Sequence, residues 1–96
     1  MNSFNQIPLE AITLYRQALE MSGRGNNELA LKNLDTAVML APKFALAYYE
    51  MGRCYEKLER FPEALSKFEK VLQTYPSHVE AEMSRNRILE KMGRKK

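Results

Sequence analysis

The chain repeats itself every 34 residues, and this period constrains its fold more than any other feature. A shift of 34 residues brings Pro8, Pro42 and Pro76 into register. Small and apolar positions between the prolines align under the same shift: Ala11 with Ala45 and Val79, Tyr15 with Tyr49 and Met83, Ala30 with Ala64, Leu31 with Leu65, and Ala37 with Val71. A period of about 20–50 residues is typical of arrays in which each repeat is one small structural unit that packs on its neighbours.

Within each unit the apolar spacing is helical. Tyr48, Met51, Tyr55 and Leu58 recur every three or four residues, which places them on one face of a helix. Because proline cannot continue a helix, the three prolines separate the units. The pattern predicts an all-α fold of antiparallel helix pairs, with five helices near residues 8–23, 26–40, 44–58, 61–74 and 78–92.

Two helix ends carry their own signals. Gly23-Arg24-Gly25 predicts a helix C-terminus at which either Gly23 or Gly25 has a positive φ. Ser77-His78-Val79-Glu80 has the spacing of a capping box, with Ser77 as the capping residue of the last helix.

At these offsets the chain resembles the tetratricopeptide-repeat family, whose pattern is an aromatic residue, a Leu-Gly pair, a Tyr, an Ala, a Phe and a Pro. The second repeat carries the pattern most fully, in Tyr48, Met51-Gly52, Tyr55, Ala64, Phe68 and Pro76. The first repeat carries a weaker version, in Leu14, Gln17-Ala18, Met21, Ala30, Leu34 and Pro42. The third has Glu82 and Asn86 at the aromatic and glycine positions, and these polar residues are typical of a terminal capping helix.

The resemblance implies one domain with a non-catalytic, protein-binding function. Its expected parts are repeat one at 11–44, repeat two at 45–78, a capping helix at 79–92 and a basic tail at 93–96. In this family the first helix of each pair lines a concave groove that holds a peptide or helix of a partner protein. The candidate groove residues are Tyr15, Leu19, Tyr49, Arg53, Met83 and Arg87. Apolar and thioether surface beside two arginines suits a peptide with apolar anchors and an acidic group.

Other interpretations of the groove residues stay open. Tyr and Met at helical spacing also suit a core, and the chain's own Phe4 and Ile7 could cover Tyr15 and Leu19. The family's clamp for chaperone tails needs Lys, Asn and Arg at set positions. The corresponding residues do not match that clamp: Tyr15, Leu19, Glu50, Glu80 and Ser84.

The charge is concentrated at the C-terminal end. Residues 85–96 hold six Lys and Arg against the single Glu90, in a chain with a net charge of +3. This segment supports an alternative function, binding of nucleic acid or an anionic surface. We favour a structural interpretation, because cations near a helix C-terminus complement its dipole and keep a capping helix soluble.

The composition excludes several classes of protein. With 45% hydrophobic and 28% charged residues the chain is neither disordered nor collagen-like. No apolar run approaches the roughly 20 residues of a membrane span. The single cysteine, Cys54, cannot form an internal disulfide, which fits a reducing cytoplasm. We expect Cys54 to be buried and the single histidine, His78, to lie solvated in a turn. One His and one Cys favour neither an enzyme, a metal site nor a cofactor.

The number of repeats leaves the oligomeric state open. Two and a half repeats fall short of the roughly three that usually bury a continuous core. Either the last helix is a sufficient cap, or two chains stack end to end through the apolar residues Phe4, Ile7 and Leu9.

Overall fold

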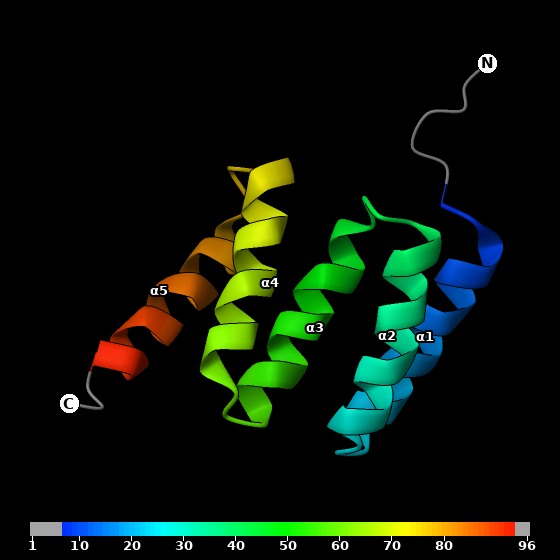
Figure 1. Cartoon of the computed structure of the whole chain (residues 1–96), viewed down its shortest axis with the longest axis horizontal. Helices are drawn as coiled ribbons and strands as arrows, with labels where there is room; N and C mark the ends of the chain where they lie inside the picture. The colour runs from blue at the N-terminus through cyan, green and yellow to red at the C-terminus, as the bar shows by residue number, and fades with distance from the viewer. Residues whose placement is uncertain (1–6, 94–96) are drawn as a thin grey trace.

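Five α-helices make up the array that the computed structural model describes for residues 7–93 (Figure 1). They are α1 (Leu9–Gly23), α2 (Asn27–Leu40), α3 (Ala45–Lys57), α4 (Phe61–Thr74) and α5 (Val79–Gly93). Every bound lies within one residue of the helix expected from the periodicity, and the described residues contain no strand. The predicted all-α fold is therefore confirmed. Of the predicted basic tail at 93–96, residues 94–96 lie outside the described residues.

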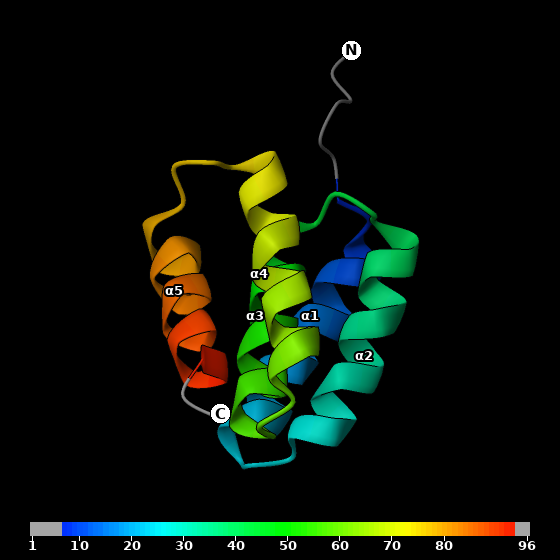
Figure 2. The same cartoon turned by 60° about the vertical axis from the view of Figure 1, so that its left-hand side comes forward.

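The helices pack in chain order. Each helix contacts the next along the chain, so that α1 and α2 form one antiparallel pair and α3 and α4 form a second. The last helix, α5, packs on α4 in the position that the first helix of a third pair would take. Figure 2 shows α2 and α5 at opposite ends of the array, with α3 and α4 between them.

Small residues on the facing helices set how closely each pair approaches. Ala18, Ala30 and Ala64 are fully buried. A close approach lies at Gly52 on α3, where an added Cβ atom would lie 2.7 Å from the ring of Phe68 on α4. The first repeat has Ala18 in place of Gly52 and Leu34 in place of Phe68. The small residue of the pair is thus larger in the first repeat, and the large residue is smaller.

The buried side chains form two clusters. The first, between α1, α2 and α3, includes Leu34, Met51 and Cys54, and the second, between α3, α4 and α5, consists of Ala64, Phe68 and Ile88. Tyr55 on α3 packs against both clusters. The burial of Cys54 confirms the expectation for that residue.

The turns inside the two pairs have the same geometry. Gly25, and not Gly23, has the positive φ (88°), and 34 residues later Glu59 has a φ of 59°. In the second turn the amide of Arg60 donates to the carbonyl of Tyr55 at 2.9 Å, the long bond of a Schellman motif. The first turn makes this conformation with glycine, whereas the second makes it with a residue that carries a Cβ atom.

The start of α5 corrects two predictions. The residue that caps this helix is His78, whose Nδ1 accepts a hydrogen bond from the amide of Ala81 at 3.0 Å. Ser77, the predicted cap, is exposed one position earlier. His78 lies in the turn as expected but is only partly solvated, because its ring lies 5.3 Å from the ring of Tyr49 and 24% of its side chain is exposed. The imidazole reaches an amide three residues ahead, as a Ser or Asp cap does.

Candidate functional site

The first helices of the units, α1, α3 and α5, carry all six predicted groove residues. On α1, Tyr15 is half-buried, and its ring lies 5.2 Å from the ring of the buried Phe44. Leu19, one helical turn further along, remains 38% exposed. Tyr15 is therefore part of the packing between α1 and the start of α3, whereas Leu19 lies at the surface of the protein.

On α3, Tyr49 connects the face to the core. Its ring packs edge-on against Phe68 at 5.6 Å and lies against the ring of His78 on its other side. The tyrosine thus has contacts with α4 and with the turn before α5. Its role in packing is established by these contacts, while a role toward a partner remains a prediction.

Arg53 is held by a buried carboxylate. Its Nη1 lies 3.4 Å from Oε1 of Glu50, whose side chain is only 5% exposed, whereas 46% of the Arg53 side chain is exposed. Burial raises the pKa of the Tyr15 hydroxyl, and the nearby Glu50 carboxylate raises it further. The arrangement brings Tyr15 and Arg53 to the same buried acid and leaves half of the cation available to solvent.

On α5, Met83 and Arg87 differ in their surroundings. Met83 is 60% exposed. Arg87 donates two hydrogen bonds to the carboxylate of Glu56 on α3, at 2.7 and 2.9 Å, and a third to Oγ of Ser84. The hydrogen bond from Arg87 holds the pKa of the Glu56 carboxyl below its ordinary value. Arg87 is thus first a link between α3 and α5, and its predicted contact with a partner is untested.

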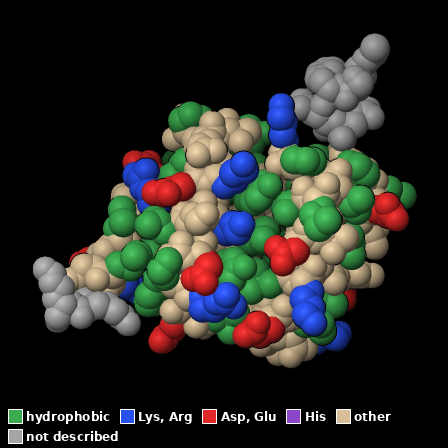
Figure 3. Space-filling model, viewed as in Figure 1, with side chains coloured by type: hydrophobic (Ala, Val, Ile, Leu, Met, Phe, Trp, Pro, Cys, Tyr) green, Lys and Arg blue, Asp and Glu red, His purple; other side chains and the backbone are tan. Residues whose placement is uncertain are grey.

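The C-terminal basic segment is partly neutralised inside the fold. Glu56 also pairs with Lys91, whose ammonium lies 3.6 Å from the carboxylate, and Arg85 donates to the side chain of Asn86. On the face that Figure 3 shows, acidic and basic side chains alternate and neither sign forms a continuous patch.

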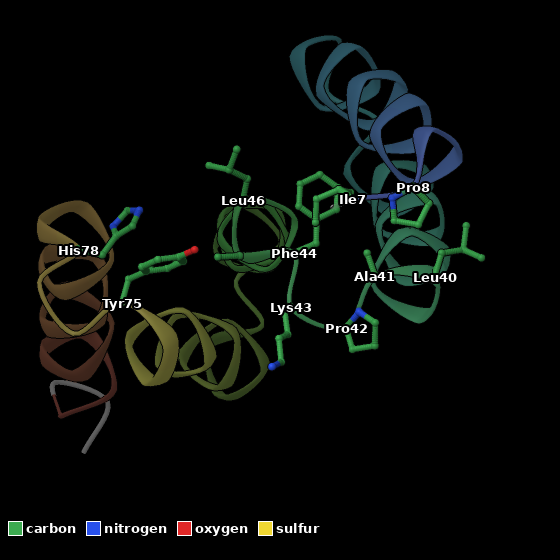
Figure 4. A pocket seen from close by; sticks show the side chains of 11 residues that line it. Ile7, Pro8, Leu40, Ala41, Pro42, Lys43, Phe44, Leu46, Tyr75 and His78 are labelled. Atoms are coloured by element: carbon green, nitrogen blue, oxygen red, sulfur yellow. The ribbon is translucent and has the colours of Figure 1, made fainter. Parts of the chain in front are cut away.

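A hollow of about 900 Å³ opens at the end of the array where the turns between units meet. Figure 4 shows Ile7 and Phe44 on one side of it, Tyr75 and His78 on the other, and Leu46 between them. We call it the turn-end hollow; its lining residues are Ile7, Pro8, Leu40, Ala41, Pro42, Lys43, Phe44, Ala45, Leu46, Tyr75 and His78. Apart from Lys43 and His78, these side chains are apolar or, in Tyr75, aromatic.

The turn-end hollow contains none of the six residues predicted from the sequence. The signal that could have located it is the proline register, because Pro8 and Pro42 line the hollow and mark the turns at this end. The 34-residue shift that aligns them also brings the turns between units to one end of the array. Leu46, the position equivalent to Ile12, belongs to this hollow and also to α3.

The described residues offer little material for catalysis or metal binding. Within residues 7–93, His, Cys, Asp and Glu side chains nowhere gather in a group of three that could hold a metal ion. Burial raises the pKa of the Cys54 thiol, so the reactive thiolate is disfavoured. Among these residues no helix combines the length and apolar character that crossing a bilayer takes.

Two comparisons bear on the fold and the family. Residues 45–78 match the tetratricopeptide repeat. The chain is also similar to the solved structure of a MamA RS-1 ArsTM double mutant, with a TM-score of 0.85 and 24% sequence identity. The similar region covers 91% of this chain and 49% of the other, so the chain spans about half the length of that protein. At this identity the likeness concerns the fold.

Proposed function

We propose that this chain, a tetratricopeptide-repeat protein, is a non-catalytic module that binds a peptide or helix of a partner protein on α1, α3 and α5. Repeats of this family mediate interactions between proteins in general. The proposal goes further by placing the contact on one set of helices and by describing the chemistry of the partner. We place the interaction in the cytoplasm, the compartment that the single cysteine favours.

The observation that carries the proposal is an exposed apolar residue on each of the three helices. Leu19 on α1, Leu46 on α3 and Met83 on α5 are 38%, 54% and 60% exposed. Leu19 and Met83 are two of the six candidate groove residues, and Leu46 lies three residues before Tyr49 on the same face of α3. A small domain gains little stability by exposing such side chains. A partner that covers them removes their apolar surface from water, which favours binding by about 25 cal/mol for each Å².

The other residues of the face support these three. Tyr15 and Tyr49 are fixed by Phe44 and Phe68, so they offer rigid aromatic edges beside the exposed side chains. Arg53, oriented by its contact with Glu50, presents a half-exposed guanidinium to an acidic side chain of the partner.

We expect the chain to act without stacking on a second copy. The three residues of α5 that are buried against α4 have equivalents on the free side of α1, 68 residues earlier. The buried residues are Ala81, Ser84 and Ile88, and the equivalents are Thr13, Arg16 and Glu20, all exposed. End-to-end stacking in the same register would bury the charged side chains of Arg16 and Glu20, which disfavours a dimer of that kind. Light scattering that gives the mass of one chain at high micromolar concentration is the expected result.

The test is a pull-down from native lysate, carried out with and without nuclease, with four baits. They are the unaltered chain, Leu19→Glu with Met83→Glu on the proposed face, Met39→Glu with Leu89→Glu as the matched control, and a chain that ends at Met92. Met39 and Leu89 are exposed apolar residues of α2 and of another side of α5. Because all four substituted side chains are exposed, circular dichroism should show equal helix content in every bait.

A protein partner that is lost only from the Leu19→Glu, Met83→Glu bait is the expected result. Equal capture by this bait and by the Met39→Glu, Leu89→Glu control would refute the proposed face. Binding that is lost on nuclease treatment or on removal of residues 93–96 would instead favour the basic segment as the binding site, and such binding should weaken steeply with salt.

A further inference from the structure

We propose that the turn-end hollow is an anchor site for one bulky apolar side chain of the partner segment, and that the same segment places an acidic side chain against Arg53. This inference rests on the proposed function and adds a second contact region to it. It also predicts the spacing between two residues of the partner.

The walls of the hollow select an apolar occupant. Ile7 and Phe44 line it from one side and Tyr75 from the other, with Leu46 between them (Figure 4). Besides Tyr75, its lining includes two polar side chains, those of Lys43 and His78, and Nδ1 of His78 already accepts a hydrogen bond from the amide of Ala81. The volume of about 900 Å³ admits a Phe or Leu side chain together with the backbone that carries it.

The side chains of Phe44 and His78, on the two sides of the hollow, are held in place by other contacts of the fold. Phe44 is buried, and Tyr15 packs against its ring at 5.2 Å. His78 is fixed by its hydrogen bond to Ala81 and by the ring of Tyr49. Binding to fixed side chains costs less conformational entropy than binding to a site that must first be ordered.

Leu46 makes the hollow continuous with the proposed face. It lines the hollow, is 54% exposed, and lies in the first turn of α3. Arg53 follows seven residues later on the same helix, with 46% of its side chain exposed. Two helical turns separate the two residues by about 10 Å along the helix axis.

This separation sets the spacing in the partner. An extended peptide advances about 3.3 Å per residue, so about three residues cover the distance from Leu46 to Arg53. For an extended partner segment, the inference thus requires a Phe or Leu three positions from an Asp or Glu. The charge of Arg53 favours the acidic residue, and the apolar walls of the hollow favour the large apolar one.

The probes for the test are synthetic ten-residue peptides of Gly and Ser that carry one Phe and one Asp. The separation of Phe from Asp varies from one to six residues, in both orders. Binding is followed by amide chemical-shift changes in the isotope-labelled full chain. We expect the peptide with a separation of three to bind about tenfold more tightly than those with separations of one or six, and to shift the amides of Ala41, Leu46 and Arg53.

A matched pair of variants tests the hollow itself. Leu40 and Met39 are neighbouring exposed residues of α2, but only Leu40 lines the hollow. Leu40→Glu should weaken binding of the best peptide about tenfold, while Met39→Glu should leave it unchanged. Equal effects of the two substitutions would overturn the inference.

The remaining outcomes separate this inference from the proposed function. Peptide binding that is lost with Leu19→Glu and Met83→Glu, yet unaffected by Leu40→Glu, would leave the proposed face in place and refute the hollow as an anchor. Shifts of the hollow amides on removal of residues 1–6, with no peptide present, would make the chain's own segment the occupant and overturn the inference. Shifts that depend on protein concentration would overturn it in favour of a second copy. If no peptide shifts any amide, the anchor site is refuted, whereas the proposed face still depends on the pull-down.

Discussion

Replacement of Gly52 by alanine should destabilise the fold, although alanine is the better helix former. The added Cβ would lie 2.7, 2.8 and 2.9 Å from three ring atoms of Phe68. Ordinary contacts between carbon atoms are about 3.5–4.0 Å, so the ring has to move by about 1 Å. Phe68 is fully buried and packs against Tyr49, which leaves the ring little room to move.

The magnitude follows from two opposing terms. Overpacking of a well-packed core costs typically about 1–3 kcal/mol, and three close contacts on a fixed ring place this site at the upper end. Alanine in place of glycine inside a helix returns about 1 kcal/mol. We therefore expect Gly52→Ala to lower the free energy of unfolding by about 2 kcal/mol. Urea denaturation followed by circular dichroism measures this change.

The first repeat supplies the compensating substitution and Gly23 supplies the control. Phe68→Leu recreates the pairing of the equivalent residues, Ala18 and Leu34, so the double variant should be more stable than the sum of the two single effects by about 1–2 kcal/mol. Gly23→Ala, where an added Cβ meets nothing within 4 Å, should not destabilise the fold. A Gly52→Ala chain at least as stable as the unaltered one, or strictly additive effects, would refute the reasoning.

Three further predictions concern helix ends and one ion pair. Residues 25 and 59 both have a left-handed φ, which a Cβ atom disfavours. Glu59→Gly should therefore raise the free energy of unfolding by about 1 kcal/mol, and Gly25→Ala should lower it by a similar amount. Urea denaturation measures both changes. His78→Ala should lower the free energy of unfolding by about 1 kcal/mol through loss of the α5 cap, whereas His78→Asn, which restores an acceptor, should lower it less; thermal melts compare the two. Because the pKa of the Glu56 carboxyl is lowered in the folded state, its ionised form stabilises the fold above its ordinary pKa of about 4.3, and this stabilisation is lost as the pH falls through the folded-state pKa. The Glu56→Gln variant should therefore lose less stability than the unaltered chain when the pH falls from neutral to acidic. Urea titrations at the two pH values measure these losses. Equal losses would count against stabilisation of the fold by the ion pair of Glu56 with Arg87.

Most of the fold could be predicted from the sequence because the patterns that determine it are periodic and lie within or between neighbouring helices. Helical spacing located all five helices, and the 34-residue shift paired them, because every helix packs on its neighbour in the chain. Gly52 and Phe68 were identified as a small and a large residue of one repeat, and in the structure they meet.

The site was harder to predict because its contacts join residues that are far apart in the sequence. The pairing of Arg87 with Glu56 spans 31 positions, and no pattern in the chain marks it. Residue type favours Ser77 as the cap of α5, since histidine is seldom a cap. The contact that holds His78 in place comes from the ring of Tyr49, which lies 29 positions earlier in the sequence. The turn-end hollow depends on how three separate segments come together, which only the three-dimensional arrangement determines.

The division of the core into two clusters that share Tyr55 has a consequence for the dynamics of the chain. Each cluster is a candidate unit of local unfolding, so native-state hydrogen exchange should show α5 opening at a lower free energy than α1 and α2. A partner that covers both Met83 on α5 and Leu19 on α1 stabilises only states in which the two units are folded together. Binding should therefore slow exchange most in α5, and the two halves of the array should then unfold as one cooperative unit.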